Sequence, residues 1–424
     1  MKADLLITNI GQLVTCASNG KPKRGADMCD VGMIESGAIA VVDGKFAAVG
    51  RASEIEGEWT ADEVIDAEGR IVCPGFVDPH THIVFAGDRL NEFELKIKGA
   101  DYLEILAAGG GILSTVEKTR AASVDDLVES ALKRLNKMLA CGTTTAEIKT
   151  GYGLDHDNEM KMLAVIEELE KRHPIDIVPT FLAAHAIPSE FKGRSDEYLN
   201  QICKHWLLEV WNWWSLSDFF GKAPCFVDIY CEQGAYRPDQ MSRLIEAVAE
   251  FKGTLGFKAH VDQFNNLGGS RIAIEAGATS IDHLDMVADE EISLLADSDT
   301  TGVVIPTENF NSAKAKFSPA RKLIDEGCVV ALSTDYNPGS APCPSQPMAM
   351  AIACRYQKLL PSEAMNAATI NAAFAIGLGD RVGSIEIGKS ADCLIADTTD
   401  YREIAYEFGK SNFSRVVKNG KIVL

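Results

Sequence analysis

The stretch GFVDPHTHI, residues 75–83, joins a short apolar run to two histidines, His80 and His82, that stand two positions apart. Side chains two apart on a strand share a face, so both imidazoles can point to one side. Similar β-rich runs follow at 143–150, 176–185, 226–232, 255–262, 279–284, 301–308 and 328–335. Helical stretches separate these runs, as parallel α/β folds require. The eight strand–helix units predict a (β/α)8 barrel, or TIM barrel, and favour it as an alternative to a doubly wound sheet.

The helical stretches carry their own start and stop signals. SVDDLVESALKRLNKMLACG, residues 123–142, begins at the N-cap candidate Ser123 and stops at Gly142, which can adopt the left-handed conformation that ends helices. NEMKMLAVIEELEKRHP, residues 158–174, ends at Pro174, which cannot continue a helix.

Both ends of the chain are predicted to be β structure. Asp43-Gly44 joins two apolar runs within residues 38–50, and Asn419-Gly420 does the same within residues 415–424. Asp-Gly and Asn-Gly are strong signals for two-residue hairpins, because both central positions must accept positive φ. We therefore expect residues 1–74 and 375–424 to form one small β-sandwich domain, with the barrel, residues 75–374, inserted between them.

Composition and net charge limit the classes of partner and the cellular compartment that the protein can have. The formal net charge of −20 argues against nucleic acid as a partner, and an anionic substrate would need a local cation in its pocket. Eleven cysteines, an odd number without a C-x-x-C pair, suit a reducing compartment, so we expect a cytoplasmic protein. The N-terminus lacks the pattern of a signal peptide, and no apolar run approaches the ~18 residues that would cross a membrane.

Polar residues gather where the predicted strands end. Besides His80 and His82, His260 ends the fifth strand, His283 the sixth and Asp335 the eighth. TIM-barrel active sites lie at these carboxyl ends, so the five side chains are expected to meet. Imidazoles with one carboxylate suit zinc, iron(II) or manganese, and an open metal position lowers the pKa of bound water to about 7.

These residues carry a resemblance to a known group of enzymes. PGFVDPHTH, together with His260, His283 and the STD of residues 333–335, resembles the amidohydrolase superfamily. Longer segments resemble the imidazolonepropionase family within it, over nearly the whole chain. They are residues 85–120, IKTGYGLD (148–155), FLAAHAIP (181–188), HVDQF (260–264) followed by LGG, and STDYNPGSAP (333–342).

The resemblance implies hydrolysis of 4-imidazolone-5-propanoate to N-formimidoyl-glutamate, the third step of histidine degradation. It implies one divalent metal, zinc or iron, held by His80, His82, His260 and Asp335. His283 would polarise the carbonyl or stabilise the developing oxyanion. Asp335 would take the proton of the attacking water and pass it to the leaving ring nitrogen. A homodimer is common in the family and is expected here.

The resemblance also implies a set of substrate-binding residues. Arg89 would pair with the propanoate carboxylate, which a planar guanidinium suits. Tyr152 and His185 would contact the imidazolone ring. The new carboxylate and the formimidoyl portion of the product would be held by Asn337, Gly339 and Ser340.

Two features depart from the family pattern. Gln263 stands where many relatives have a glutamate, and a glutamine can only hydrogen-bond, so we interpret it as an orienter of substrate or water and not as a base. Residues 204–224, KHWLLEVWNWWSLSDFFGKAP, are unusually rich in tryptophan, and packing is the expected role.

The glycines at 109–111 are predicted to form a lid beside the pocket.

Other interpretations stay open. Without the resemblance, Arg89 is a plain surface arginine and Tyr152 an ordinary loop aromatic, and Asn337 and Gly339 merely shape the turn around Pro338. Lys149 falls on the second strand, whereas the carboxylated lysine that bridges two metals in other amidohydrolases belongs on the fourth. The rival functions are another cyclic amidohydrolase or a deaminase acting on a hydantoin or purine, and a scaffold protein without activity.

Overall fold

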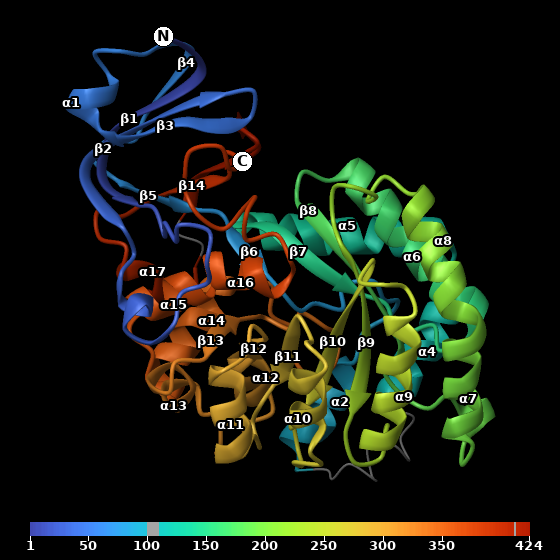
Figure 1. Ribbon diagram of the computed structural model, residues 1–424. Helices are drawn as coiled ribbons and strands as arrows, with labels where there is room; N and C mark the ends of the chain where they lie inside the picture. The colour runs from blue at the N-terminus through green and yellow to red at the C-terminus, as the bar shows by residue number, and fades with distance from the viewer. Residues whose placement is uncertain (100–109, 411–412) are drawn as a thin grey trace.

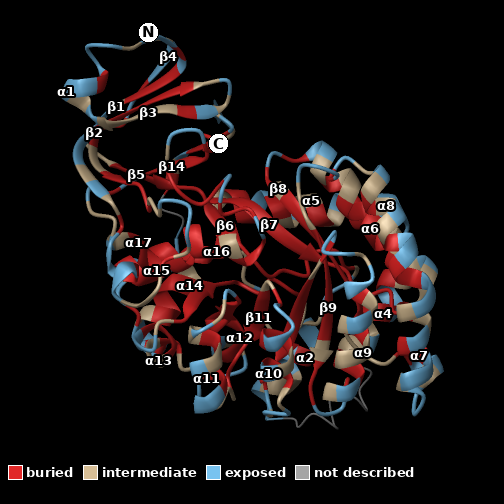
Figure 2. Cartoon of the chain, viewed as in Figure 1, coloured by how far each residue is buried: buried red, intermediate tan, exposed pale blue. Residues whose placement is uncertain are grey.

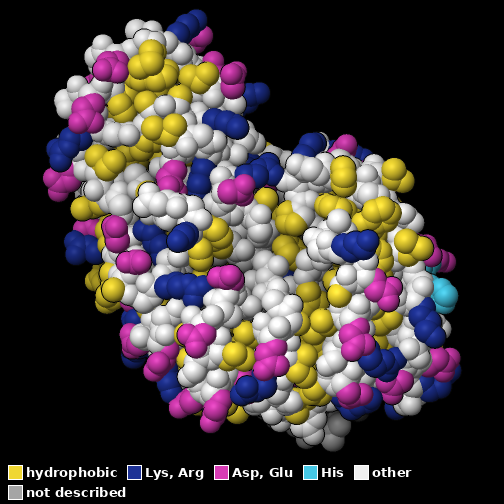
Figure 3. Space-filling model, viewed as in Figure 1, with side chains coloured by type: hydrophobic (Ala, Val, Ile, Leu, Met, Phe, Trp, Pro, Cys, Tyr) yellow, Lys and Arg dark blue, Asp and Glu magenta, His cyan; other side chains and the backbone are white. Residues whose placement is uncertain are grey.

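The protein forms a barrel of parallel strands with a smaller β domain at one side (Figure 1). The computed structural model describes residues 1–99, 110–410 and 413–424. Among these residues, no helix is long and apolar enough to cross a membrane. Acidic and basic side chains are interspersed over the face shown in Figure 3.

The predicted barrel is confirmed. Its sheet contains eight strands, hydrogen-bonded in sequence order, and every neighbouring pair is parallel. The strands are β6 (Phe76–Asp78), β7 (Thr143–Lys149), β8 (Asp176–Ala184), β9 (Cys225–Cys231), β10 (Leu255–Val261), β11 (Ser280–His283), β12 (Thr301–Val304) and β13 (Val329–Leu332). Nearly all of their residues are buried, as Figure 2 shows.

Helices cover the outside of this barrel. They are α2 (Leu90–Ile97), α4 (Ile112–Ala121), α5 (Val124–Ala140), α6 (His156–Arg172), α7 (Ser195–Gln201), α8 (Leu207–Leu216), α9 (Pro238–Ala249), α10 (Gly269–Glu275), α11 (Asp289–Ala296), α12 (Pro306–Asn311), α13 (Ala320–Asp325), α14 (Gln346–Ile352), α15 (Pro361–Ala367) and α16 (Ile370–Ala375). The Ser123 cap is confirmed, since its side chain accepts a hydrogen bond from the Asp126 N–H. The hydrophobic residues of α5, which follow the cap, are buried.

Five predicted strands end one residue earlier than expected, and three end three to five residues earlier. The ladder of β12 stops at Val304, and Pro306 starts helix α12 inside the predicted run 301–308. Proline has no N–H for a ladder, but its fixed φ suits the first turn of a helix. Strand β6 stops at Asp78 and β13 at Leu332, so the segments with His80, His82 and Asp335 are irregular backbone beyond the strands.

Side chains complete the barrel between its first and last strands, which share no ladder among the described residues. The Gln346 amide donates to the carbonyls of Val77 (3.0 Å) and Leu332 (3.2 Å), one on each strand. Beyond the strands, the His82 N–H donates to the Tyr336 carbonyl at 3.0 Å. We call this junction the seam.

Both termini build the second sheet, as predicted. Its order is β16-β15-β14-β5-β1-β2-β3, with β4 pairing with β1. The bounds are β1 (Lys2–Val14), β2 (Met33–Val42), β3 (Lys45–Arg51), β4 (Thr60–Asp66), β5 (Ile71–Pro74), β14 (Cys393–Ala396), β15 (Phe413–Lys418) and β16 (Lys421–Ile422). Short helices α1 (Ala52–Ile55) and α17 (Glu403–Tyr406) accompany it. Both hairpins are confirmed, with positive φ at Asp43, Gly44, Asn419 and Gly420.

Candidate metal centre

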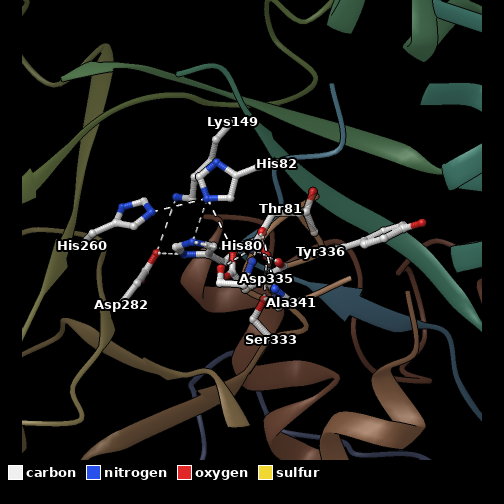
Figure 4. A network of polar contacts seen from close by, with 12 residues as sticks. His80, Thr81, His82, Lys149, His260, Asp282, Ser333, Asp335, Tyr336 and Ala341 are labelled. Atoms are coloured by element: carbon white, nitrogen blue, oxygen red, sulfur yellow. Dashed lines mark hydrogen bonds and ion pairs between the residues drawn. The ribbon is translucent and has the colours of Figure 1, made fainter. Parts of the chain in front are cut away.

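The predicted metal ligands converge at the carboxyl ends of the strands. His80 and His82 follow β6, His260 lies in β10, and Asp335 follows β13. The Nε2 atoms of His80 and His82 are 3.2 Å apart, and His260 Nε2 lies 3.4 Å from His82 Nε2 (Figure 4). Asp335 Oδ1 lies 3.6 Å from each of the His80 and His82 Nε2 atoms.

This spacing fits a divalent ion. Four ligand atoms arranged tetrahedrally at the usual 2.0–2.1 Å from a zinc ion lie about 3.4 Å from one another. Four separations come close to that value: the three among His80, His82 and Asp335, and the one between His82 and His260, are 3.2–3.6 Å. Three imidazole nitrogens and one carboxylate oxygen are also the donor types that zinc and iron(II) accept.

Acceptors behind two of the rings fix the direction in which they point. His80 Nδ1 lies 2.6 Å from Asp282, and His260 Nδ1 lies 3.1 Å from Asp228. Each carboxylate holds the Nδ1 proton and turns Nε2 toward the centre. Burial, together with the charges of Lys149 and neighbouring histidines, lowers the pKa of His80 well below its usual value. The ring is therefore neutral, as a metal ligand must be.

Asp335 and His283 both have strained backbone conformations, which set the directions of their side chains. Asp335 has φ 49° and His283 φ 89°, in the left-handed region that residues with a Cβ seldom adopt. The Asp335 turn is held because Asp78 accepts hydrogen bonds from the hydroxyls of Ser333 (2.6 Å) and Thr334 (2.5 Å). Such strain is typical of functional sites, where the surrounding structure enforces the conformation.

His283 lies beside the predicted ligands. Its ring centre is 5.5 Å from that of His80 and 5.4 Å from that of His260. His283 Nδ1 is buried without a hydrogen-bond partner among the described residues. This position suits a contact with substrate, and a nitrogen of His283 also lies within 4.8 Å of nitrogens of His80 and His260.

Aromatic rings form a wall next to the ligands. His185 stacks on His82 with ring centres 4.9 Å apart and planes 13° from parallel. The ring of Tyr152 is 5.6 Å from that of His185, and the ring of Tyr230 is 6.2 Å from it on another side. The Tyr230 hydroxyl donates to Gln263 Oε1 at 2.7 Å. The structure thus brings the predicted residues Tyr152, His185 and Gln263 together around the centre.

Arg89 is held by a partner that we did not predict. Its guanidinium makes two hydrogen bonds to the Glu92 carboxylate, of 2.7 and 2.6 Å. The opposite edge faces Gly339, where an added Cβ would lie 2.2 Å from Arg89 Nη1. The structure therefore places Arg89 against the loop after β13.

That loop is organised by Asn337. Its Oδ1 accepts from the N–H groups of Gly339 and Ser340, both at 2.8 Å, and its Nδ2 donates to the Asp335 carbonyl at 2.7 Å. In the structure Asn337 therefore shapes the turn. The three predicted product-binding residues lie together beside Asp335.

Several functional residues were not predicted. Asp228 and Asp282 lie inside strand runs, and Tyr230 follows Asp228 by two positions on β9, hence on the same face. That polar spacing within FVDIYC was the available signal. Glu232, just after β9, accepts from the N–H groups of Phe264 (2.9 Å) and Asn265 (3.3 Å), next to Gln263.

The tryptophan-rich segment lies outside the centre. It forms α8 and the π-helix η3 (Ile202–Trp206) before it, on the outside of the barrel. The indole N–H of Trp211 donates to Thr254, that of Trp213 to Glu167 and that of Trp214 to the Ala223 carbonyl. These bonds support the packing role. Of the predicted glycine lid, Gly109 lies outside the described residues, and Gly111 caps α4.

Comparisons with known proteins support the fold and give the family. Two models described as amidohydrolase family match residues 63–170 and 238–423. An adenosine deaminase from Xanthomonas campestris with bound zinc has the same fold, with a TM-score of 0.70 at 19% identity over 100% of this chain and 93% of that one. The guanine deaminase of E. coli gives a TM-score of 0.69 at 16% identity, over 99% and 98% of the two chains.

Relatives with similar sequences identify the family within the amidohydrolases. The imidazolonepropionase of Chloroflexus aggregans is 49% identical over 422 residues, covering 99% of this chain and 98% of that one. That of Herpetosiphon aurantiacus is 49% identical over 424 residues, covering 99% and 97%. That of Bacillus cytotoxicus is 44% identical, covering 99% and 96%. With such identity along nearly its whole length, and with the histidine and aspartate side chains assembled at the strand ends, the chain belongs to the imidazolonepropionase family of amidohydrolases.

Proposed function

We propose that this chain hydrolyses the cyclic amide bond of 4-imidazolone-5-propanoate to give N-formimidoyl-L-glutamate, the third step of histidine degradation. The observation that carries the proposal is the convergence of His80, His82, His260 and Asp335, with Arg89 against the loop that follows Asp335, in a chain up to 49% identical to named imidazolonepropionases. The reaction needs water, an electrophilic ring carbonyl, a proton acceptor and a clamp for the propanoate.

The metal would be held by His80, His82, His260 and Asp335. Zinc or iron bound there supplies a Lewis acid that activates water and polarises a carbonyl. The Nε2 atoms available for it are set by the hydrogen bonds of His80 to Asp282 and of His260 to Asp228.

The remaining residues would place the substrate. Arg89 pairs with the propanoate carboxylate through a guanidinium that Glu92 already orients. The flat imidazolone ring lies against Tyr152 and His185, whose rings form the wall of the centre. Gln263 orients substrate or water, with its own Oε1 fixed by Tyr230.

The proton would move through Asp335. In this proposal Asp335 accepts a proton from the attacking water and transfers it to the ring nitrogen as the C–N bond breaks. His283 donates to the oxyanion that forms from the carbonyl oxygen. Asn337, Gly339 and Ser340 receive the new carboxylate and the formimidoyl group.

We place the enzyme in the cytoplasm, as a homodimer. All eleven cysteines are free thiols, which suits a reducing compartment. Light scattering coupled to gel filtration tests the assembly, and a monomer at micromolar concentration would contradict the dimer.

The testing experiment follows hydrolysis of freshly generated 4-imidazolone-5-propanoate by its ultraviolet absorbance, for wild type and Arg89→Ala. Rapid turnover that falls in the variant, mainly through a raised KM, supports both the substrate and the clamp. No turnover by metal-loaded wild type would overturn the assignment, and hydantoins and purines would be screened next. Elemental analysis that finds no metal, in protein made with metal supplied, would favour the inactive scaffold.

A further inference from the structure

A layer of charged side chains lies directly beneath the predicted ligands, inside the barrel. It consists of Glu147 and Lys149 on β7, Asp228 on β9, Lys258 on β10 and Asp282 on β11. All five side chains are wholly buried. Charged groups are rarely buried unless they are paired. Barrel interiors are usually filled by branched apolar residues, so a charged layer there is unusual and points to a specific role.

Lys149 is at the middle of the layer. Its ammonium donates to Asp228 Oδ2 at 2.7 Å and to Glu147 Oε1 at 3.0 Å. It also lies 3.5 Å from Asp282 Oδ2, a contact that Figure 4 shows. Burial opposes the charge of Lys149, but the attraction of these three carboxylates raises its pKa above the usual value. Lys149 is thus a fixed ammonium, surrounded by acceptors.

Two of these carboxylates are the acceptors behind metal ligands. Asp282 holds His80, and Asp228 holds His260. Both carboxylates lie within 3.5 Å of the same Lys149 nitrogen, so they would repel each other strongly without it. One cation therefore determines the position of two acceptors, and through them the direction of two Nε2 atoms.

We propose that Lys149 is the positioning residue of the metal centre, which sets its affinity by fixing the Asp228–His260 and Asp282–His80 pairs together. This inference rests on the metal-dependent function proposed above. Losing a partner behind a ligand typically weakens metal binding 10–100-fold. Lys149 supports two ligands, so its removal should reach the upper part of that range.

Lys258 provides a matched control. It is equally buried and also bonds Glu147, at 2.7 Å, but its other hydrogen bond goes to the Pro79 carbonyl at 2.8 Å. It lies 4.0 Å from Asp282 and has no contact with Asp228 among the described interactions. Replacing either lysine by methionine removes one cation from this buried layer of carboxylates and destabilises the fold. Only Lys149 bridges both acceptors.

The experiment measures zinc affinity of the metal-free full chain by competition with a chromophoric chelator, alongside thermal unfolding. Lys149→Met should bind zinc about 100-fold more weakly than wild type. Lys258→Met should lose less than about threefold, although its melting temperature falls by a comparable amount. Equal losses in the two variants, or unchanged affinity in Lys149→Met, would overturn the proposal.

A charge-compensated variant keeps the test decisive if Lys149→Met does not fold. Asp228→Asn retains an acceptor for His260 without a charge, so Asp282 no longer has a repelling neighbour there. Lys149→Met/Asp228→Asn should therefore bind zinc within about threefold of Asp228→Asn alone, a coupling that a space-filling role for Lys149 would not produce. A further loss above tenfold in the double variant overturns the proposal. Wild type that binds no zinc would overturn the metal centre itself.

Discussion

The hydroxyl of Ser333, just past the last barrel strand, donates a 2.6 Å hydrogen bond to the carboxylate of Asp78, at the end of the first. Asp78 also accepts from the Thr334 hydroxyl at 2.5 Å and the Thr334 N–H at 3.2 Å. These bonds fix the turn that carries Asp335 to the strand that precedes His80. The two sides of the metal centre are thus held together by one buried carboxylate.

Removing that carboxylate should affect both stability and metal binding. Asp78→Ala leaves three donors without their acceptor, which we expect to lower the free energy of unfolding by about 2–4 kcal/mol. Zinc affinity should also fall, since Asp335 loses its anchored turn. Urea unfolding and chelator competition measure the two effects. Asp78→Asn, which keeps one acceptor oxygen, should lose less of each, and an equal loss would contradict the hydrogen-bond explanation.

Gly339→Ala tests the placement of Arg89. The new Cβ would lie 2.2 Å from Arg89 Nη1, so the guanidinium must move away from residue 339. We expect KM to rise about tenfold or more with a smaller change in kcat, because the clamp for the propanoate is displaced, and with melting temperature nearly unchanged. Gly57→Ala, where the added carbon meets nothing within 4 Å, is the control. A normal KM in Gly339→Ala would argue against this position of Arg89 in the working enzyme.

Tyr230 and Gln263 should act as one unit. Their 2.7 Å hydrogen bond fixes the Gln263 amide, so Tyr230→Phe is expected to lower kcat about 5–30-fold, as the loss of 1–2 kcal/mol in the transition state implies. Adding Gln263→Ala to Tyr230→Phe should then cost less than the two single changes together. Steady-state kinetics of the four proteins in the cycle provide the test, and strict additivity would mean that the two residues act separately.

Stability should fall between about pH 4.5 and pH 7 because of Glu170. Burial, together with the charge of Asp176, raises the Glu170 pKa to about 7. The folded state therefore keeps a proton that the unfolded state releases, and stability is lost as pH rises through this range. Glu170→Gln can still accept from Ile177 N–H, a 2.9 Å bond in wild type. It should exceed wild type at pH 8 by about 1–2 kcal/mol, allowing for partial exposure.

The check on Glu170 is a pair of denaturation curves at several pH values. The advantage of Glu170→Gln should shrink as the pH falls toward 4.5 and vanish below it, where Glu170 is protonated in both the folded and the unfolded state. A difference that stays constant with pH would show that packing, and not ionisation, separates the two proteins.

The sequence predicts the barrel and its ligands because both depend on local patterns. Each strand is a compact apolar run, and metal-binding types such as His260 and Asp335 stand out at its end. The ends themselves were less predictable: residues 305–308 are apolar and polar in a strand-like order, yet Pro306 starts a helix. A single proline outweighs the run, since it cannot donate to the ladder.

Supporting residues were harder to predict, because their meaning depends on contacts between distant strands. Asp282 is unremarkable in TSIDHL until β11 places it against His80. Arg89 was found through motif resemblance, but its approach to Gly339 follows from how two loops meet across the seam. The sequence places Lys149 on the wrong strand for a bridging ligand, and only the folded barrel brings it against three carboxylates.

With the metal ligands proposed above, the seam would also couple the stability of the fold to the supply of metal. His80 and His82 come from one side of it and Asp335 from the other, so an ion bound by all three works as a cross-link between the first and last strands. By mass action, each tenfold rise of free ion above the dissociation constant adds about 1.4 kcal/mol to the free energy of unfolding. In a cell with little free metal, the enzyme would therefore be both inactive and less stable. Proteases would then degrade the metal-free enzyme before the metal-bound form.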